Sequence, residues 1–198
     1  KNLILFRVGG DEVRCFLYVI SCHSRIVVSD VDGTITKSDV LGHLLPAMGW
    51  DWSHRGIARL LSSIQRNGYT IMYLSSRSIG QADITRGFLA SLEQAGGFKM
   101  PPGPIILSPQ GIIPSLIREV VLRRPHEFKI AALTGIKELF PPNSSPFYAG
   151  LGNRDTDEIS YRAVGVDPKR IFIINPKGEL RTAVVAPSVL APVAGPVA

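Results

Sequence analysis

Two carboxylates one residue apart are the first residues along the chain that could do chemistry. Asp30 and Asp32 directly follow Ile26–Val28, a short apolar, β-branched run that predicts a buried strand. Side chains at i and i+2 of a strand point the same way, so both carboxylates are expected in one small volume at the carboxyl end of that strand. Like charges this close repel unless a cation lies between them, and a divalent ion with oxygen ligands suits that position.

Gly33 and Thr34 complete the sequence Asp-Val-Asp-Gly-Thr. A surface turn rich in Asp and Gly would explain a bare pair of aspartates. The full stretch after an apolar strand resembles the first motif of the haloacid dehalogenase-like (HAD) phosphatases. That resemblance implies a nucleophilic role for Asp30 and a general acid/base role for Asp32.

The composition is that of an ordinary globular protein. A chain of 198 residues, 45% hydrophobic and 19% charged, fits one α/β domain with a small addition. The formal charge of +6 favours anionic partners such as phosphate esters or acidic lipid surfaces, but no block of like charge is long enough for a nucleic-acid tail, and we expect no nucleic-acid partner. No apolar run approaches the roughly 20 residues that span a bilayer. Cys15 and Cys22 are too few for a disulfide framework and favour a reducing compartment.

Polar side chains also follow two later apolar strands. Residues 69–74 predict a strand that ends at Ser75, whose hydroxyl could donate to a phosphoryl oxygen. Residues 147–152 predict another, followed by the amide of Asn153 and the carboxylate of Asp157, which suit a divalent ion. Ligand crevices in open α/β sheets lie at the carboxyl ends of the strands, so these groups are expected near Asp30.

A cation is needed to neutralise the nucleophile and the transferring phosphoryl group. Lys129 lies near the start of a helix predicted over residues 127–140 and is the preferred candidate. Lys137, two turns further along the same helix, remains the alternative.

The rest of the chain must position these residues, and it divides into three parts. Residues 1–25 predict two strands joined by a Gly-rich turn, and residues 183–198, rich in Ala, Val and Pro, predict a disordered tail. Between them, strands alternate with helices over residues 26–182, which predicts a mostly parallel, five-stranded sheet covered on both faces. The expected strands are 26–28, 69–74, 105–107, 147–152 and 170–175.

A possible docking element follows the first motif. Leu41, Leu44 and Leu45 form a Leu-x-x-Leu-Leu pattern, which can act as a docking helix for regulatory proteins. Apolar residues at i, i+3 and i+4 more often face a domain's own core. Both interpretations stay open.

Several stretches together resemble a narrower family. They are residues 30–39, 41–49, 68–69, 75–80, 85–87, 147–149, 152–154, 164–166 and 175–179. Over roughly residues 26–180 the chain is similar to the C-terminal catalytic region of the lipins, the Mg²⁺-dependent phosphatidate phosphatases. The resemblance implies a HAD-like, Rossmannoid three-layer sandwich with a minimal cap. It also implies that residues 1–25 are the remnant of the immunoglobulin-like domain of lipins.

The resemblance further implies the reaction and its residues. Phosphatidate would be hydrolysed at a membrane surface to diacylglycerol and phosphate through an aspartyl-phosphate, within glycerolipid and triacylglycerol synthesis. The catalytic residues would be Asp30, Asp32, Thr34, Ser75 and Lys129, with Thr34 steadying Asp32 and Ser75 steadying the phosphoryl oxygens. Mg²⁺ would be held by Asp30, the backbone carbonyl of Asp32 and Asn153, with Asp157 in support. Candidates for contacting the dianionic headgroup are Lys37, Arg77, Arg86 and Arg154.

One departure from the HAD pattern affects the metal site. HAD enzymes commonly carry an acid where this chain has Asn153, so one ligand charge is missing and Mg²⁺ binding should be weaker. The lipin resemblance places the protein in the cytoplasm, peripheral to the endoplasmic reticulum membrane, with the nucleus as a second location.

Two other functions stay open. One is a catalytically silent lipid-binding or regulatory module of the same fold, such as the related domain of certain phosphatidylinositol transfer proteins. The intact catalytic set argues against it. The other is a HAD phosphatase that acts on a soluble or protein phosphate.

Overall fold

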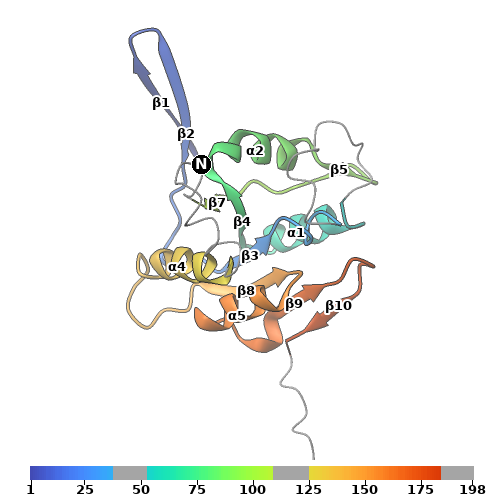
Figure 1. The fold of residues 1–198 in the computed structure, drawn as a ribbon. Coiled ribbons are helices and arrows are strands. Elements are labelled where there is room, and N and C mark those ends of the chain that lie inside the picture. Colours follow the sequence, from blue (N-terminus) through green and yellow to red (C-terminus); the bar gives the residue numbers. More distant parts are fainter. Residues whose placement is uncertain (38–52, 109–124, 184–198) are drawn as a thin grey trace, which may run out of the picture.

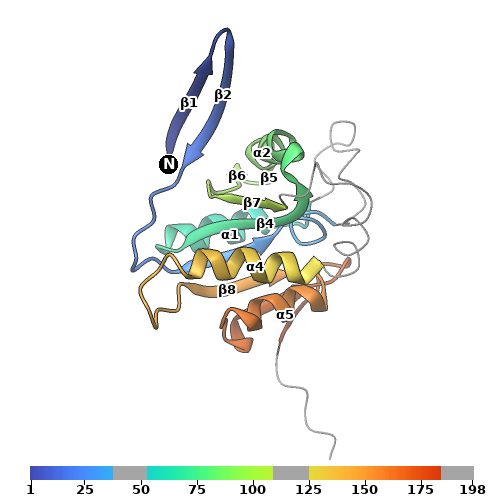
Figure 2. The ribbon, with the colours of Figure 1, turned by 60° about the vertical axis from the view of Figure 1, so that its left-hand side comes forward.

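The structure, a computed structural model, describes residues 1–37, 53–108 and 125–183. Within these ranges a six-stranded sheet forms the centre, in the order β10-β9-β8-β3-β4-β7 (Figures 1 and 2). Five of these strands run parallel, and β10 runs antiparallel at one edge. They are β3 (Ile26–Asp30), β4 (Thr70–Ser78), β7 (Ile105–Ser108), β8 (Phe147–Gly152), β9 (Ile171–Ile174) and β10 (Leu180–Thr182).

The mostly parallel sheet and its covering helices confirm the expected α/β class, and all five expected strands are present. The expected sheet size was wrong, because β10 adds a sixth strand. A tight turn at Asn175–Gly178 returns the chain beside β9: the Gly178 N–H donates to the Asn175 carbonyl at 2.8 Å, and Gly178 adopts φ +86°. A strand of three exposed residues is too short to show a periodic pattern in the sequence.

The central strand β3 is buried at every position because both of its faces are covered. Its side chains alternate, with Val27 in one hydrophobic cluster and Ile26 and Val28 in the other. The cluster around Val27 includes residues of α1 (Ile57–Arg66) and α2 (Ala82–Ser91). The cluster around Val28 includes residues of α4 (Pro125–Lys137) and α5 (Asp155–Ala163). The sheet is therefore the middle of three layers (Figure 2).

The two strands expected before residue 25 are confirmed as a hairpin of β1 (Asn2–Val8) and β2 (Asp11–Leu17). The hairpin projects away from the sheet, and most of its side chains are exposed (Figures 1 and 2). Its origin in an immunoglobulin-like domain stays a prediction.

The predicted tail was wrong at its first residue: the Ala183 N–H donates to the Ile171 carbonyl at 3.0 Å, and the Ala183 side chain is buried against the sheet domain. The rest of the predicted tail, residues 184–198, lies outside the described residues. No helix in the described ranges has the length and apolar character needed to cross a bilayer. Leu41, Leu44 and Leu45 lie outside the described residues.

The remaining elements of the described chain are short. They are η4 (Ile79–Gln81), β5 (Glu93–Gln94), β6 (Phe98–Lys99) and η5 (Pro168–Arg170).

Candidate active site

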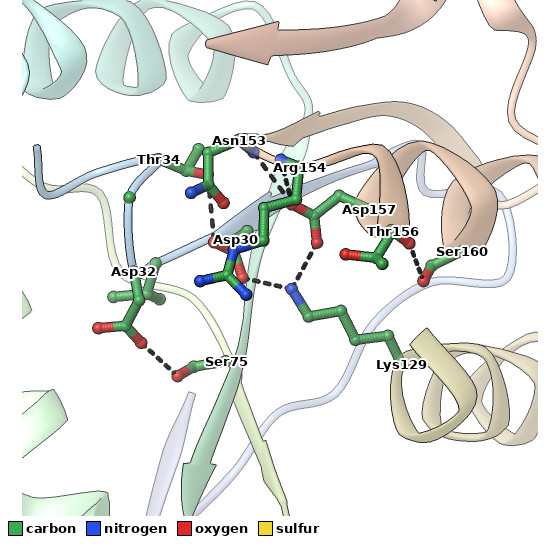
Figure 3. A network of polar contacts seen from close by, with 12 residues as sticks. Asp30, Asp32, Thr34, Ser75, Lys129, Asn153, Arg154, Thr156, Asp157 and Ser160 are labelled. Atoms are coloured by element: carbon green, nitrogen blue, oxygen red, sulfur yellow. Dashed lines mark hydrogen bonds and ion pairs between the residues drawn. The ribbon is translucent and has the colours of Figure 1, made fainter. Parts of the chain in front are cut away.

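Most of the predicted site residues meet at the carboxyl edge of the sheet (Figure 3). Asp30 is the last residue of β3, and Ser75 lies near the end of the neighbouring β4. Asn153 follows β8 on the other side of β3. Because parallel strands bring their carboxyl ends to one edge, residues far apart in the sequence share this small volume.

Lys129 bridges two buried carboxylates. Its Nζ lies 2.6 Å from Asp30 Oδ1 and 2.6 Å from Asp157 Oδ1. Only 2% of Asp30, 6% of Lys129 and 1% of Asp157 is exposed, so the three charges interact with little solvent between them. Lys137, the alternative lysine, donates instead to the backbone carbonyl of Val164 at 2.9 Å. The geometry therefore favours Lys129 as the lysine of the site.

Asp157 is held from behind by backbone amides. Its Oδ2 accepts hydrogen bonds from the N–H groups of Asn153 at 3.0 Å and Arg154 at 3.1 Å, at the start of α5. Gly152 lets the chain pass this close, because a Cβ there would lie 2.4 Å from Asp157 Cβ. With Oδ2 on these amides and Oδ1 on Lys129, Asp157 orients the lysine.

Thr34 contacts a different aspartate from the one expected. Its Oγ1 donates to Asp30 Oδ2 at 3.1 Å, whereas we expected it to steady Asp32. The chain turns back sharply after β3, since the Ile35 N–H donates to the Val31 carbonyl and the Gly33 N–H donates to Thr36 Oγ1. This turn, with Gly33 at φ +82°, places Thr34 over Asp30.

Asp32 is held by β4. Ser75 Oγ donates to Asp32 Oδ2 at 2.9 Å, so the Ser75 hydroxyl binds the residue expected to act as the general acid/base. Arg77, expected at the headgroup, binds Asp32 as well: Nε lies 3.0 Å from Oδ1 and 3.1 Å from Oδ2, and Nη2 lies 2.5 Å from Oδ1. The sequence indicated both residues but not these pairings.

The comparison with known proteins identifies the family. The profile of the LNS2 (Lipin/Ned1/Smp2) family matches residues 1–189. The chain belongs to the LNS2 family.

Relatives of this LNS2 chain carry names that state an activity. Phosphatidate phosphatase PAH1 of Arabidopsis thaliana is 52% identical over 187 residues, covering 92% of this chain and 21% of that protein. Phosphatidate phosphatase LPIN1 of Homo sapiens is 49% identical over 164 residues, covering 83% and 18%. Phosphatidic acid phosphohydrolase 1 of Saccharomyces cerevisiae is 53% identical over 192 residues, covering 91% and 22%. The chain spans about a fifth of the length of these relatives.

The electrostatics of the LNS2 site leave a negative charge to be balanced. The pKa of the Asp30 carboxyl is raised to about 7. Burial is the largest cause, and Asp157 and Asp32 also raise this pKa, whereas Lys129 opposes them by lowering it. Burial alone would lower the pKa of Lys129, but Asp30 and Asp157 together raise it above its usual value, so the ammonium stays charged. When Asp30 is ionised, one ammonium faces two carboxylates, and one negative charge is left unbalanced in a buried site.

A divalent cation fits this charge and these donors. Asp30 can offer a carboxylate oxygen, Asn153 an amide oxygen, and Asp32 its backbone carbonyl, all hard ligands of the kind that Mg²⁺ takes. In the described part of the chain, no group of three or more His, Cys, Asp or Glu side chains has the arrangement of a metal site. A metal would therefore depend on the carbonyl and the amide as well as on Asp30, and Mg²⁺ binding stays a prediction.

The other headgroup candidates differ in their relation to the site. Arg154 immediately precedes α5, and its backbone binds Asp157. Arg86 forms a surface ion pair with Asp83 on α2. Lys37 lines a cavity of about 620 Å³ beside the start of α1. Their contact with a headgroup stays a prediction.

Sequence reasoning missed one residue that supports the site. Thr85 of α2 is fully buried, and its Oγ1 accepts a hydrogen bond from Arg77 Nη1 at 3.3 Å. The only signal was its place in one of the stretches that resemble lipins, because a lone threonine in a helix carries no chemical signal of its own.

Proposed function

We propose that this LNS2 chain hydrolyses phosphatidate to diacylglycerol and inorganic phosphate in a Mg²⁺-dependent reaction. The observation that carries the proposal is the buried contact of Asp30 with Lys129, beside Asp157, at the carboxyl edge of the sheet. A carboxylate beside a fixed positive charge supports a role for Asp30 as the nucleophile of phosphoryl transfer. The names of relatives about 50% identical to this chain support the choice of substrate.

In the first step, a carboxylate oxygen of Asp30 attacks the phosphorus of phosphatidate. The bond between phosphorus and the glycerol oxygen breaks, and an aspartyl-phosphate forms on Asp30. Asp32 donates a proton to the departing glycerol oxygen, which leaves as the hydroxyl of diacylglycerol. Lys129 neutralises charge beside the nucleophile, and Thr34 holds the other Asp30 oxygen in place.

In the second step, water attacks the phosphorus of the aspartyl-phosphate. Asp32, ionised after the first step, accepts a proton from this water. The bond between phosphorus and the Asp30 oxygen breaks, inorganic phosphate leaves, and the Asp30 carboxylate is restored. One residue thus serves first as acid and then as base.

The residues proposed to hold Mg²⁺ are Asp30, the backbone carbonyl of Asp32 and Asn153, with Asp157 behind them. When bound, the ion would supply positive charge to the phosphoryl oxygens and to Asp30. We also propose that the substrate is taken from a membrane surface, with the protein peripheral to the endoplasmic reticulum, as part of glycerolipid synthesis.

Phosphate release tests the proposal. The chain is assayed on phosphatidate in mixed detergent micelles, with and without Mg²⁺, beside glycerol 3-phosphate and a phosphopeptide. We expect Mg²⁺-dependent release from phosphatidate and little release from the other two. Faster turnover of a soluble or peptide phosphate would overturn the choice of substrate. Binding of phosphatidate without phosphate release would instead indicate a silent lipid-binding module.

A further inference from the structure

Both oxygens of the Asp32 carboxylate are engaged by hydrogen bonds from Arg77 and Ser75. Its Oδ1 accepts from Arg77 Nε at 3.0 Å and from Nη2 at 2.5 Å. Its Oδ2 accepts from Ser75 Oγ at 2.9 Å and from Arg77 Nε at 3.1 Å. The single Nε–H of Arg77 is shared between the two oxygens, so three hydrogens occupy most of the roughly four lone-pair sites of the ionised carboxylate. A carboxyl oxygen cannot carry a proton while it accepts hydrogen bonds from a charged guanidinium, so Asp32 can act as the acid only after Arg77 has left at least one of its oxygens.

Arg77 is built into the protein and is not a surface arginine that happens to lie near the site. The residue is only 8% exposed. Its Nη1 donates to Thr85 Oγ1 at 3.3 Å, and Thr85 donates in turn to the Gln81 carbonyl at 2.9 Å. The backbone N–H of Arg77 donates to Ser75 Oγ at 3.1 Å. The guanidinium is therefore supported from α2 while its other edge faces Asp32.

We infer that Arg77 is a latch on Asp32 that the phosphoryl group of the substrate opens. A phosphomonoester dianion offers paired oxygens that match the guanidinium fork, and it carries more charge than the carboxylate it replaces. When Arg77 turns to the phosphate, Asp32 keeps Ser75, and the freed oxygen can take up a proton from solvent and pass it to the departing glycerol oxygen. A phosphodiester monoanion attracts the guanidinium less, so the latch selects phosphomonoesters. Asp32 is thus freed only when a suitable phosphate is bound.

This inference rests on the proposed function, but its first test does not need turnover. The arginine Nε–Hε resonances of the ¹⁵N-labelled chain are recorded in Mg²⁺ during titration with inorganic phosphate, and separately with dimethyl phosphate as the monoanionic probe. The Arg77 resonance is assigned by its absence from the spectrum of Arg77→Lys. We expect phosphate to shift this resonance and dimethyl phosphate to leave it in place. An Arg77 resonance that does not respond to phosphate overturns the latch, whether or not other signals move.

Kinetics separate a latch from a fixed support for Asp32. In Arg77→Gln the phosphate loses a charged partner, so KM for the phosphomonoester should rise by about 10- to 100-fold, and kcat should fall by less. A guanidinium that only holds Asp32 in place predicts the opposite, with kcat reduced and KM unchanged. The matched control is Arg66→Gln, because Arg66 is exposed on α1 and its described bond is to Ser63 of the same helix. Its KM and kcat should both equal those of the wild type.

A milder variant covers the case in which Arg77→Gln does not fold. Thr85→Val removes the hydroxyl behind the guanidinium without changing charge, and it should raise KM by about 10-fold, the effect of losing one hydrogen bond that involves a charged group. A fall in kcat alone would contradict the latch. If the wild type hydrolyses no phosphate ester, the proposed function fails, and the phosphate titration still decides whether Arg77 exchanges partners.

Discussion

Lys129 Nζ contacts Asp30 Oδ1 at 2.6 Å although the two residues are 99 positions apart in the sequence. The contact joins the first turns of α4 to the end of the central strand β3, and the same nitrogen reaches Asp157 of α5. Three elements from distant parts of the chain thus meet at one ammonium group. The site forms only when the sheet and the helices on this face are both in place.

Asp30→Asn should abolish phosphate release without unfolding the protein. The amide keeps an oxygen near Lys129 and Thr34, but it is not a nucleophile, so we expect kcat to fall by about 10⁴-fold or more. Circular dichroism and the thermal midpoint check that the fold is retained. Turnover near the wild-type rate would remove Asp30 from the nucleophile role.

Lys129→Met should destabilise the protein strongly. The substitution leaves Asp30 and Asp157 buried beside each other without a cation, and breaking such a buried pair costs about 3–5 kcal/mol. Lys137→Met is the control on the same helix, since it removes one bond to a backbone carbonyl and should cost about 1 kcal/mol. The free energies of unfolding come from urea titrations monitored by tryptophan fluorescence. Equal losses in the two variants would contradict the bridging role of Lys129.

Gly152→Ala should disturb Asp157 while leaving every charge in place. The added Cβ would lie 2.4 Å from Asp157 Cβ and 2.7 Å from Oδ2, so the carboxylate must move, at a cost of about 1–3 kcal/mol. Gly135→Ala in α4 is the matched control, because an added Cβ there meets no atom within 4 Å. It should stabilise the protein by about 0.5–1 kcal/mol, as alanine does in a helix. Urea unfolding gives both values, and a neutral Gly152→Ala would show that Asp157 is not tightly held.

The metal-free protein should become less stable as the pH rises. The pKa of Asp30 is raised from 3.8 to about 7, so between these values the folded protein holds a proton that the unfolded chain has released. The free energy of unfolding therefore falls from about pH 4 to about pH 7 and then levels off as far as this group is concerned. Urea midpoints measured in a chelator at several pH values test this.

Two comparisons sharpen the pH experiment. Asp30→Asn should remove this component of the pH dependence, because the amide does not titrate. Mg²⁺ should raise the unfolding midpoint most at high pH, where Asp30 is ionised and able to bind it. A midpoint unaffected by Mg²⁺ at every pH would contradict a metal held by Asp30.

The sequence predicted the location of the site better than its internal contacts. Strands such as residues 26–28 are local apolar patterns, and in a parallel sheet the strand ends determine where Asp30, Ser75 and Asn153 meet. The partner of Thr34 was predicted wrongly, and the bond from Ser75 to Asp32 was not predicted, because each depends on how the chain turns after β3. That turn is determined by hydrogen bonds such as the one from Gly33 to Thr36, and the sequence pattern does not contain them.

The position of Arg77 could not be predicted for a related reason. An arginine after a strand is equally compatible with a surface ion pair, a headgroup contact and a bond to Asp32. Only the packing of α2 against β4, with Thr85 behind the guanidinium, distinguishes among them. β10 was missed because three exposed residues carry no periodicity, and it forms only when the turn at Gly178 brings it beside β9.

The bridge at Lys129 also limits which substitutions a chain of this family could accept at the site. Losing the lysine alone would leave the carboxylates of Asp30 and Asp157 buried without a cation. A descendant that lost this lysine would keep a sound interior only if Asp30 and Asp157 changed with it, most simply to apolar side chains of similar volume. Selection for a folded protein would therefore preserve Lys129 for as long as both acids remain, even where selection for turnover had lapsed.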